Sequence, residues 1–278
     1  MNTTHFIDTD ELQRGLGEHR ILDCRFTLGD SGAGRRQYGD GHIPGAQYAD
    51  LEAHLSGLSG AGRHPLPQLE ALAQTLAQFG IESDSSVVVY DDNKLAFAAR
   101  AWWLLRAVGI TKVRILNGGY SAWTSASAPI QQHAEIIVPS MIGMISTLRW
   151  QSVCYDYQQI TKAIETAAIN LVDSREEARY RGDYEPIDAI AGHIPTAINK
   201  DWQQVCDQQG FVRDQHFQQQ RWQTLPADKP LVIYCGSGVT ACVNILSATL
   251  AGVEASLYAG SWSDWCNQPG AAIALGCD

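Results

Sequence analysis

The sequence repeats itself once, and this repeat limits the possible folds more than any other feature. Three segments occur in both halves, in the same order along the chain: Asp23-Cys24-Arg25 and Asp173-Ser174-Arg175, GHIPGA at 41–46 and GHIPTA at 192–197, and NGGYSAW at 117–123 and AGSWSDW at 259–265. The offset between the copies changes only from about 150 to about 142 residues, which indicates loops of different length rather than chance similarity. Copies this long predict a tandem duplication of one domain.

Each copy alternates short β-branched runs with helical patterns. The apolar run VVVY at 87–90 corresponds to LVIY at 231–234, and a helical pattern follows each of them. This alternation predicts an α/β fold in which each domain has a mostly parallel central sheet flanked by helices. The expected division is a first domain at 1–124, a linker of small residues and prolines at 125–148, and a second domain at 149–278.

Composition and charge exclude several kinds of partner. The 278 residues are 45% hydrophobic and 18% charged, which gives enough apolar material for two cores. The net charge of −10 argues against a surface for nucleic acid or for anionic membranes. The chain has no secretory leader pattern and no apolar stretch of bilayer length. Seven irregularly spaced cysteines without a CxxC pair argue against a zinc ribbon and a thioredoxin-type pair, and predict a cytoplasmic protein with reduced thiols. The chemistry expected below implies no metal or organic cofactor.

One loop in the second copy carries the predicted chemistry. Cys235 follows the run at 231–234, Gly236 and Gly238 come next, and a helical pattern begins directly afterwards. The glycines let several loop amides converge on the sulfur, and converging amides and a helix N-terminus both favour an anion. Cys235 is therefore predicted to be a thiolate nucleophile able to carry a persulfide, rather than an inert buried cysteine. The first copy has Asp91 at this position, which predicts a non-catalytic first domain.

Taken together, these features resemble the two-domain rhodanese-like sulfurtransferases, which comprise thiosulfate and 3-mercaptopyruvate enzymes. The resemblance covers nearly the whole chain and implies an inactive first domain and a catalytic second domain. The loop CGSGVT at 235–240 resembles the mercaptopyruvate type, because thiosulfate enzymes typically carry Arg-Lys in place of Gly236-Ser237. The resemblance implies that sulfur passes from 3-mercaptopyruvate, through a Cys235 persulfide, to a thiol acceptor such as thioredoxin or to cyanide.

The resemblance also implies which residues bind the sulfur donor. The carboxylate of 3-mercaptopyruvate would be held by Arg179, together with the loop residues Gly236, Ser237, Gly238, Val239 and Thr240. The second arginine of the family falls near 185–188, where this chain has Ile187. This departure from the family pattern leaves the preferred sulfur donor open.

A Ser–His–Asp relay is the last feature that the resemblance implies. Ser237 would be its serine, His42 its histidine and Asp30 its aspartate, and the relay would move a proton during the reaction. Because both copies carry a GHIP histidine, a structural role in that turn is the alternative for His42 and for its counterpart His193.

Three other functions are compatible with parts of this pattern. A tyrosine phosphatase loop needs an arginine six residues after its cysteine, and Ala241 at that position excludes this class. A thiosulfate:cyanide sulfurtransferase remains the alternative among enzymes. A non-catalytic binding or regulatory module of the same fold remains the alternative from another class. In such a module the cysteine at the end of the middle strand is expected to be missing. This is the case in the first copy, which has Asp91 there, but not in the second, which has Cys235.

Overall fold

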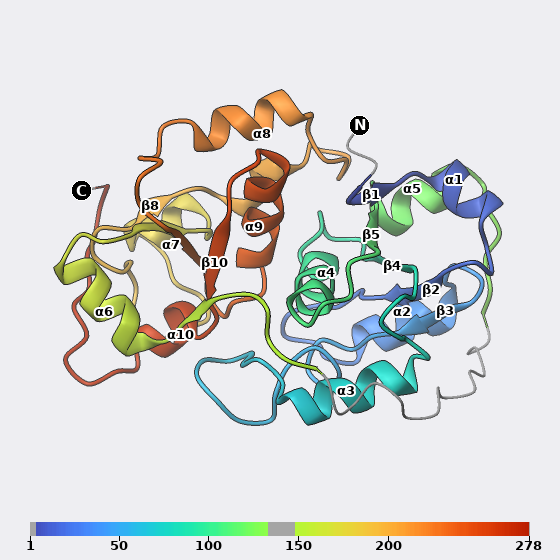
Figure 1. Cartoon of the computed structure of the whole chain (residues 1–278), viewed down its shortest axis with the longest axis horizontal. Helices are drawn as coiled ribbons and strands as arrows, with labels where there is room; N and C mark the ends of the chain where they lie inside the picture. Colours follow the sequence, from blue (N-terminus) through green and yellow to red (C-terminus); the bar gives the residue numbers. More distant parts are fainter. Residues whose placement is uncertain (1–3, 133–147, 278) are drawn as a thin grey trace. The chain divides into compact units, whose positions relative to one another are not determined.

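The computed structural model describes residues 4–132 and 148–277 (Figure 1). Most of the linker expected at 125–148 therefore lies outside the described residues. The chain divides into two compact units. Unit 1 comprises Met1–Leu58, Pro67–Ser152 and Cys206–Val212, and unit 2 comprises Ser59–Leu66, Val153–Val205 and Arg213–Asp278. A short segment from the first half of the sequence thus belongs to the second unit.

Unit 1 is built on a five-stranded parallel sheet with the strand order β1-β5-β4-β2-β3. Its strands are β1 (Phe6–Ile7), β2 (Arg20–Asp23), β3 (Ala46–Tyr48), β4 (Val87–Tyr90) and β5 (Val113–Leu116). Its helices are α1 (Thr9–Arg14), α2 (Ala33–Asp40), α3 (Leu69–Gln78), α4 (Ala98–Ala107) and α5 (Gly119–Ser125). All four residues of the middle strand β4 are buried, as the apolar run in the sequence predicts.

Unit 2 repeats this plan with the strand order β6-β10-β9-β7-β8, again parallel throughout. Its strands are β6 (Cys154–Tyr155), β7 (Asn170–Asp173), β8 (Ile198–Asn199), β9 (Leu231–Tyr234) and β10 (Ala255–Tyr258). Its helices are α6 (Tyr157–Glu165), α7 (Glu177–Arg181), the 3₁₀ helix η1 (Trp202–Val205), α8 (Gln215–Trp222), α9 (Ala241–Leu250) and α10 (Ser261–Trp265). The predicted duplicated α/β fold is confirmed.

The repeated sequence motifs build a buried frame around each middle strand. In unit 1, the Arg25 guanidinium pairs with Asp23, and its Nη2 donates to the Gly41 carbonyl at 2.7 Å. The next residue, His42, has its Nδ1 2.7 Å from the Tyr38 carbonyl, and the two rings stack with centroids 3.8 Å apart. The same contacts recur in unit 2 among Asp173, Arg175, Gly192, His193 and Tyr180. The D-x-R and GHIP motifs therefore fix one turn against the sheet in both copies.

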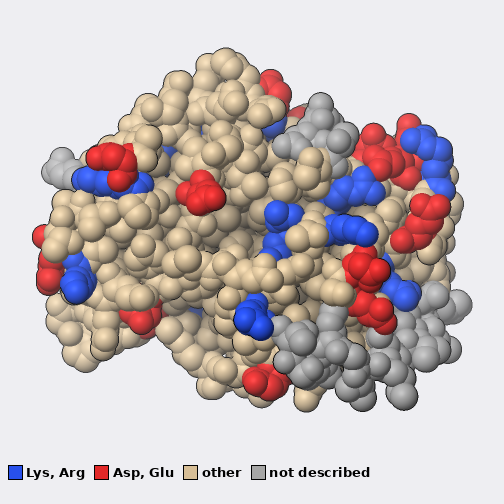
Figure 2. Space-filling model, in the orientation of Figure 1, with Lys and Arg blue, Asp and Glu red and all other residues tan. Residues whose placement is uncertain are grey.

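Two further features bear on the partners expected from composition. Among the described residues, no helix has the length and apolar character that crossing a bilayer requires. On the face of the molecule in Figure 2, basic and acidic side chains lie interspersed.

The buried ion pair of this frame can be tested in unit 1. Replacing Asp23→Asn leaves the Arg25 guanidinium buried without a counter-ion, and breaking a buried pair in this way costs about 3–5 kcal/mol. We expect a loss of this size in the free energy of unfolding, measured by urea denaturation. The control is Asp40→Asn, an exposed position where a change of no more than about 0.5 kcal/mol is expected. Equal stability of the two variants would contradict the assigned role of the pair.

Candidate active site

The structure places Cys235 directly after the middle strand β9, with its side chain 1% exposed. Its N–H donates to Ser261 Oγ at 3.1 Å, and its carbonyl accepts a hydrogen bond from the Trp262 N–H at 3.0 Å. The carbonyl of Gly236 accepts from the Ser263 N–H at 2.9 Å. These contacts attach the start of the cysteine loop to the first turn of α10.

The first copy shows what a loop at this position does with an anion. Asp91 directly follows β4, and its side chain is buried. Four backbone N–H groups donate to its carboxylate at 2.8–3.2 Å: those of Asn93, Leu95, Phe97 and Ala98. Burial raises the pKa of the Asp91 carboxyl, and the four amides act in the opposite direction. The loop is therefore a built receptor for a negative group attached to its first residue.

In the second copy the corresponding amides have no such carboxylate. Within the described part of the chain, the N–H groups of Ser237 and Val239, which correspond to those of Asn93 and Leu95, have no hydrogen-bond partner, and neither does that of Thr240. The N–H of Cys242, which corresponds to that of Ala98, donates instead to the Val239 carbonyl at 3.1 Å. Gly238 adopts φ +76°, and a Cβ there would overlap the Ala259 carbonyl, so this position requires glycine. Backbone N–H groups without partners, next to a cysteine, form an environment that favours an anion.

Two arginines lie over the same loop, each fixed by an internal carboxylate. Arg179 in α7 donates through Nε and Nη2 to Glu185, at 3.1 and 2.7 Å. Arg63 donates through Nη1 to Asp188. Arg63 belongs to the segment 59–66 of unit 2, and the segment is held there by a 3.0 Å bond from the Arg63 N–H to Ser263 Oγ.

The two carboxylates have opposite pKa shifts. Burial raises the pKa of Glu185, but hydrogen bonds from Arg179 and from the amides of Asp188 and Ile187 outweigh it and lower the pKa overall. Burial also raises the pKa of Asp188, and the nearby charge of Glu185 adds to this effect. The attraction of Arg63 and Arg179 reduces the rise without cancelling it. Glu185 is therefore the better stabilised anion of the two.

The histidine bonded to Ser237 is His64, which the sequence did not single out. His64 Nδ1 lies 2.9 Å from Ser237 Oγ, and both side chains are buried. The expected partner, His42, is held by Tyr38 in the turn described above, and the expected aspartate, Asp30, is exposed and pairs with Arg36 at 2.5 Å. The sequence motifs do not identify His64, because it lies in a segment that has no counterpart among the repeated motifs.

Ile187 does not contribute a side chain to the arginine cluster. It is 44% exposed, and its backbone N–H donates to Glu185 Oε1 at 3.0 Å. Arg63 is the residue that stands next to Arg179 instead. A basic residue in the segment 59–66 carries no sequence signal that would connect it with Cys235.

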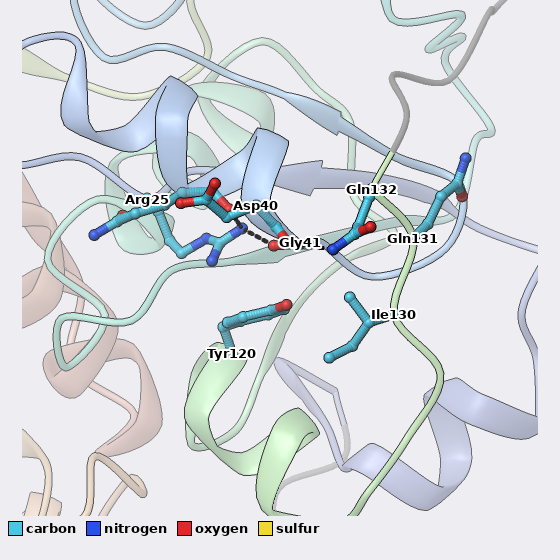
Figure 3. Close-up of a pocket in the computed structure, with 8 residues that line it drawn as sticks. Arg25, Asp40, Gly41, Tyr120, Ile130, Gln131 and Gln132 are labelled. Atoms are coloured by element: carbon cyan, nitrogen blue, oxygen red, sulfur yellow. Dashed lines mark hydrogen bonds between the residues drawn. The ribbon is translucent and has the colours of Figure 1, made fainter.

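Unit 1 has a pocket of its own beside Arg25 (Figure 3). The pocket has a volume of about 730 Å³. Its lining includes Arg25, Gly41 and Tyr120, as labelled in Figure 3. The guanidinium of Arg25 is committed to Asp23 and to the Gly41 carbonyl, and it lies 3.9 Å from the Tyr120 ring centroid. Asp23 therefore neutralises the charge of Arg25, and the guanidinium serves to hold the buried frame around β4.

Comparison with known proteins agrees with this architecture. The model of the rhodanese-like domain family matches residues 8–126 and 156–268. A Pseudomonas aeruginosa protein named “Probable 3-mercaptopyruvate sulfurtransferase” is 39% identical, over 99% of this chain and 100% of its own length. The thiosulfate sulfurtransferase of Bos taurus is 31% identical, over 88% of this chain and 84% of its own. The crystal structure of SseA from Escherichia coli superposes with a TM-score of 0.82 and 29% identity, covering 94% of this chain and 99% of that one. The chain belongs to the rhodanese family, with two rhodanese-like domains.

Proposed function

We propose that this chain is a sulfurtransferase that moves sulfur from 3-mercaptopyruvate, through a persulfide on Cys235, to a thiol acceptor. The observation that carries the proposal is the cysteine loop. Within the described residues, its N–H groups at Ser237, Val239 and Thr240 make no hydrogen bond, whereas the matching loop of the first copy binds the carboxylate of Asp91. Relatives named 3-mercaptopyruvate sulfurtransferase support the choice of sulfur donor.

The first half of the reaction forms the persulfide. The Cys235 thiolate attacks the sulfur of 3-mercaptopyruvate and forms an S–S bond. The carbon–sulfur bond breaks, and its electron pair stays on carbon as the enolate of pyruvate. The proton of the new persulfide, Cys–S–S–H, moves to the enolate carbon, which leaves pyruvate and an anionic persulfide. The loop amides stabilise this anion as they stabilise Asp91 in the first copy.

Ser237 and His64 are proposed to move that proton. Ser237 lies two residues after the reactive cysteine, and its hydroxyl is hydrogen-bonded to His64 Nδ1. A hydroxyl can accept a proton from the persulfide while it releases its own, and the histidine partner orients it for this exchange.

The second half of the reaction regenerates the enzyme. A thiol such as that of thioredoxin, or cyanide in an assay, attacks the outer sulfur, and the inner sulfur leaves as the Cys235 thiolate.

We propose that the protein acts in the cytoplasm. The seven cysteines, all within the described residues, form no disulfide, which supports a reducing compartment.

The persulfide can be observed directly by intact-protein mass spectrometry after brief exposure to 3-mercaptopyruvate. We expect a mass gain of one sulfur atom in the parent protein and no gain in Cys235→Ser. Cys277→Ser, which removes an exposed thiol, should gain one sulfur like the parent. A gain that persists in Cys235→Ser would contradict the proposal. A parallel exposure to thiosulfate tests the alternative sulfur donor.

A second experiment distinguishes the two histidines. His64→Gln preserves a hydrogen bond to Ser237 but cannot exchange a proton, so kcat with 3-mercaptopyruvate should fall by about 100-fold. In a plot of kcat against pH, the part that reflects protonation of His64 should also be absent in this variant. His42→Gln should lower the melting temperature and leave the kcat of the folded protein unchanged. If His42→Gln lowers kcat and His64→Gln does not, the assignment is wrong.

A further inference from the structure

We propose that Arg63 is the second arginine of the sulfur-donor site, and that Asp188 balances its charge so that the site favours a monocarboxylate over a dianion. The inference rests on the proposed function, because it names the residues that would bind the carboxylate of 3-mercaptopyruvate. The family's second arginine is absent here, since its position is occupied by Ile187. Arg63, from a different part of the chain, would take its role.

The two guanidinium groups are arranged as a pair of directed hydrogen-bond donors. One side of each is held by a carboxylate: Nη1 of Arg63 by Asp188, and Nε and Nη2 of Arg179 by Glu185. Within the described residues, Nη2 of Arg63 and Nη1 of Arg179 make no hydrogen bond. A Cβ built on Gly236 would lie 3.0 Å from Arg63 Nη2, 3.5 Å from Arg179 Nη2 and 3.8 Å from Arg179 Nη1. Both unused nitrogens therefore lie close to Gly236, the residue next to Cys235.

Gly236 keeps this space open. It is not among the glycines with positive φ, so its backbone conformation does not require glycine. A side chain at this position would instead meet the two guanidinium groups. The missing Cβ leaves room between the loop and the arginines, where a carboxylate could accept hydrogen bonds from both. The arginines are also reachable, since their side chains are 31% exposed for Arg63 and 13% exposed for Arg179.

The segment that carries Arg63 is fixed against the cysteine loop at neighbouring points. The Arg63 N–H is bonded to Ser263 Oγ, and the next residue, His64, is bonded to Ser237. A Cβ on Gly62 would overlap the Gly260 carbonyl, so the backbone at that position lies close against the turn before α10. Arg63 therefore approaches Gly236 from an anchored backbone, which is the support that a binding residue needs.

Asp188 sets the charge of the site. The two arginines pair with two nearly buried carboxylates, Glu185 and Asp188. Glu185 also pairs with Arg175, whose own counter-ion is Asp173, so the connected group has three arginines and three carboxylates and is electrically balanced. Asp188 Oδ2 is buried and makes no hydrogen bond within the described residues, although Arg179 Nη2 lies 3.7 Å away. A buried carboxylate with an unsatisfied oxygen is costly to keep, which indicates a role beyond holding Arg63. A balanced site binds a monocarboxylate through directed bonds but offers no surplus charge to a dianion such as thiosulfate.

The role of Arg63 is tested by binding and by steady-state kinetics. In Arg63→Gln, KM for 3-mercaptopyruvate should rise by about 10- to 100-fold, because one charge-assisted hydrogen bond is lost, while kcat changes little. The matched control is Arg181→Gln, which removes a more exposed arginine of α7 and should leave KM unchanged. A KM in Arg63→Gln equal to that of the parent would overturn the assignment.

A calorimetric measurement separates this inference from the proposed function. The Cys235→Ser protein cannot form the persulfide, yet it keeps both arginines, so it should still bind pyruvate. Adding Arg63→Gln should weaken that binding by about 10-fold or more. Unchanged affinity, or no pyruvate binding to Cys235→Ser, would overturn the inference whatever the outcome of the persulfide experiment.

The charge balance is tested with Asp188→Asn, which removes one negative charge at constant size. The ratio of kcat/KM for thiosulfate to kcat/KM for 3-mercaptopyruvate should rise by about 10-fold. Asp183→Asn, which neutralises a more exposed carboxylate that pairs with Arg181, should leave the ratio as in the parent. An unchanged or lower ratio in Asp188→Asn would show that Asp188 does not set the preference for the sulfur donor.

Discussion

The convergence of backbone amides beyond the middle strand of each sheet is the constraint on which the rest of this protein depends. A parallel strand that ends in a tight loop before a helix leaves several N–H groups without partners. In the first copy Asp91 fills this receptor with its own carboxylate. In the second copy Cys235 stands at the same place, and within the described residues the N–H groups of Ser237, Val239 and Thr240 have no partner. In our proposal, the exchange of this residue is the first difference between the non-catalytic and the catalytic copy.

The repeated motifs maintain the geometry of this loop rather than its chemistry. In unit 2, the Tyr234 hydroxyl at the end of β9 accepts a hydrogen bond from the Ile194 N–H at 3.1 Å. Ile194 belongs to the GHIP turn, which Arg175 fixes through the Gly192 carbonyl. The strand that delivers Cys235 is therefore tied to the motif that the chain carries twice. The equivalent bond, from the Ile43 N–H to the Tyr90 hydroxyl, is present in unit 1.

The sequence was sufficient to predict the duplicated α/β fold and the position of Cys235, because both follow from local patterns. A buried apolar run, a cysteine and two glycines define the loop within a few residues of each other. The choice of histidine could not be predicted in this way. Spacing in the sequence does not distinguish a histidine that holds a turn, as His42 does, from one that is hydrogen-bonded to Ser237, as His64 is. No sequence pattern connects Arg63 and His64 with the Cys235 loop, for a different reason. They lie in the first half of the sequence but belong to the second unit, and only tertiary structure shows this.

The central claim, that the loop amides bind the sulfur anion, is tested most directly by a crystal structure of the protein after reaction with 3-mercaptopyruvate. The account predicts an outer sulfur on Cys235 that accepts hydrogen bonds from the N–H groups of Ser237, Val239 and Thr240. An outer sulfur that points away from the loop, with these amides bonded to other protein groups, would contradict it.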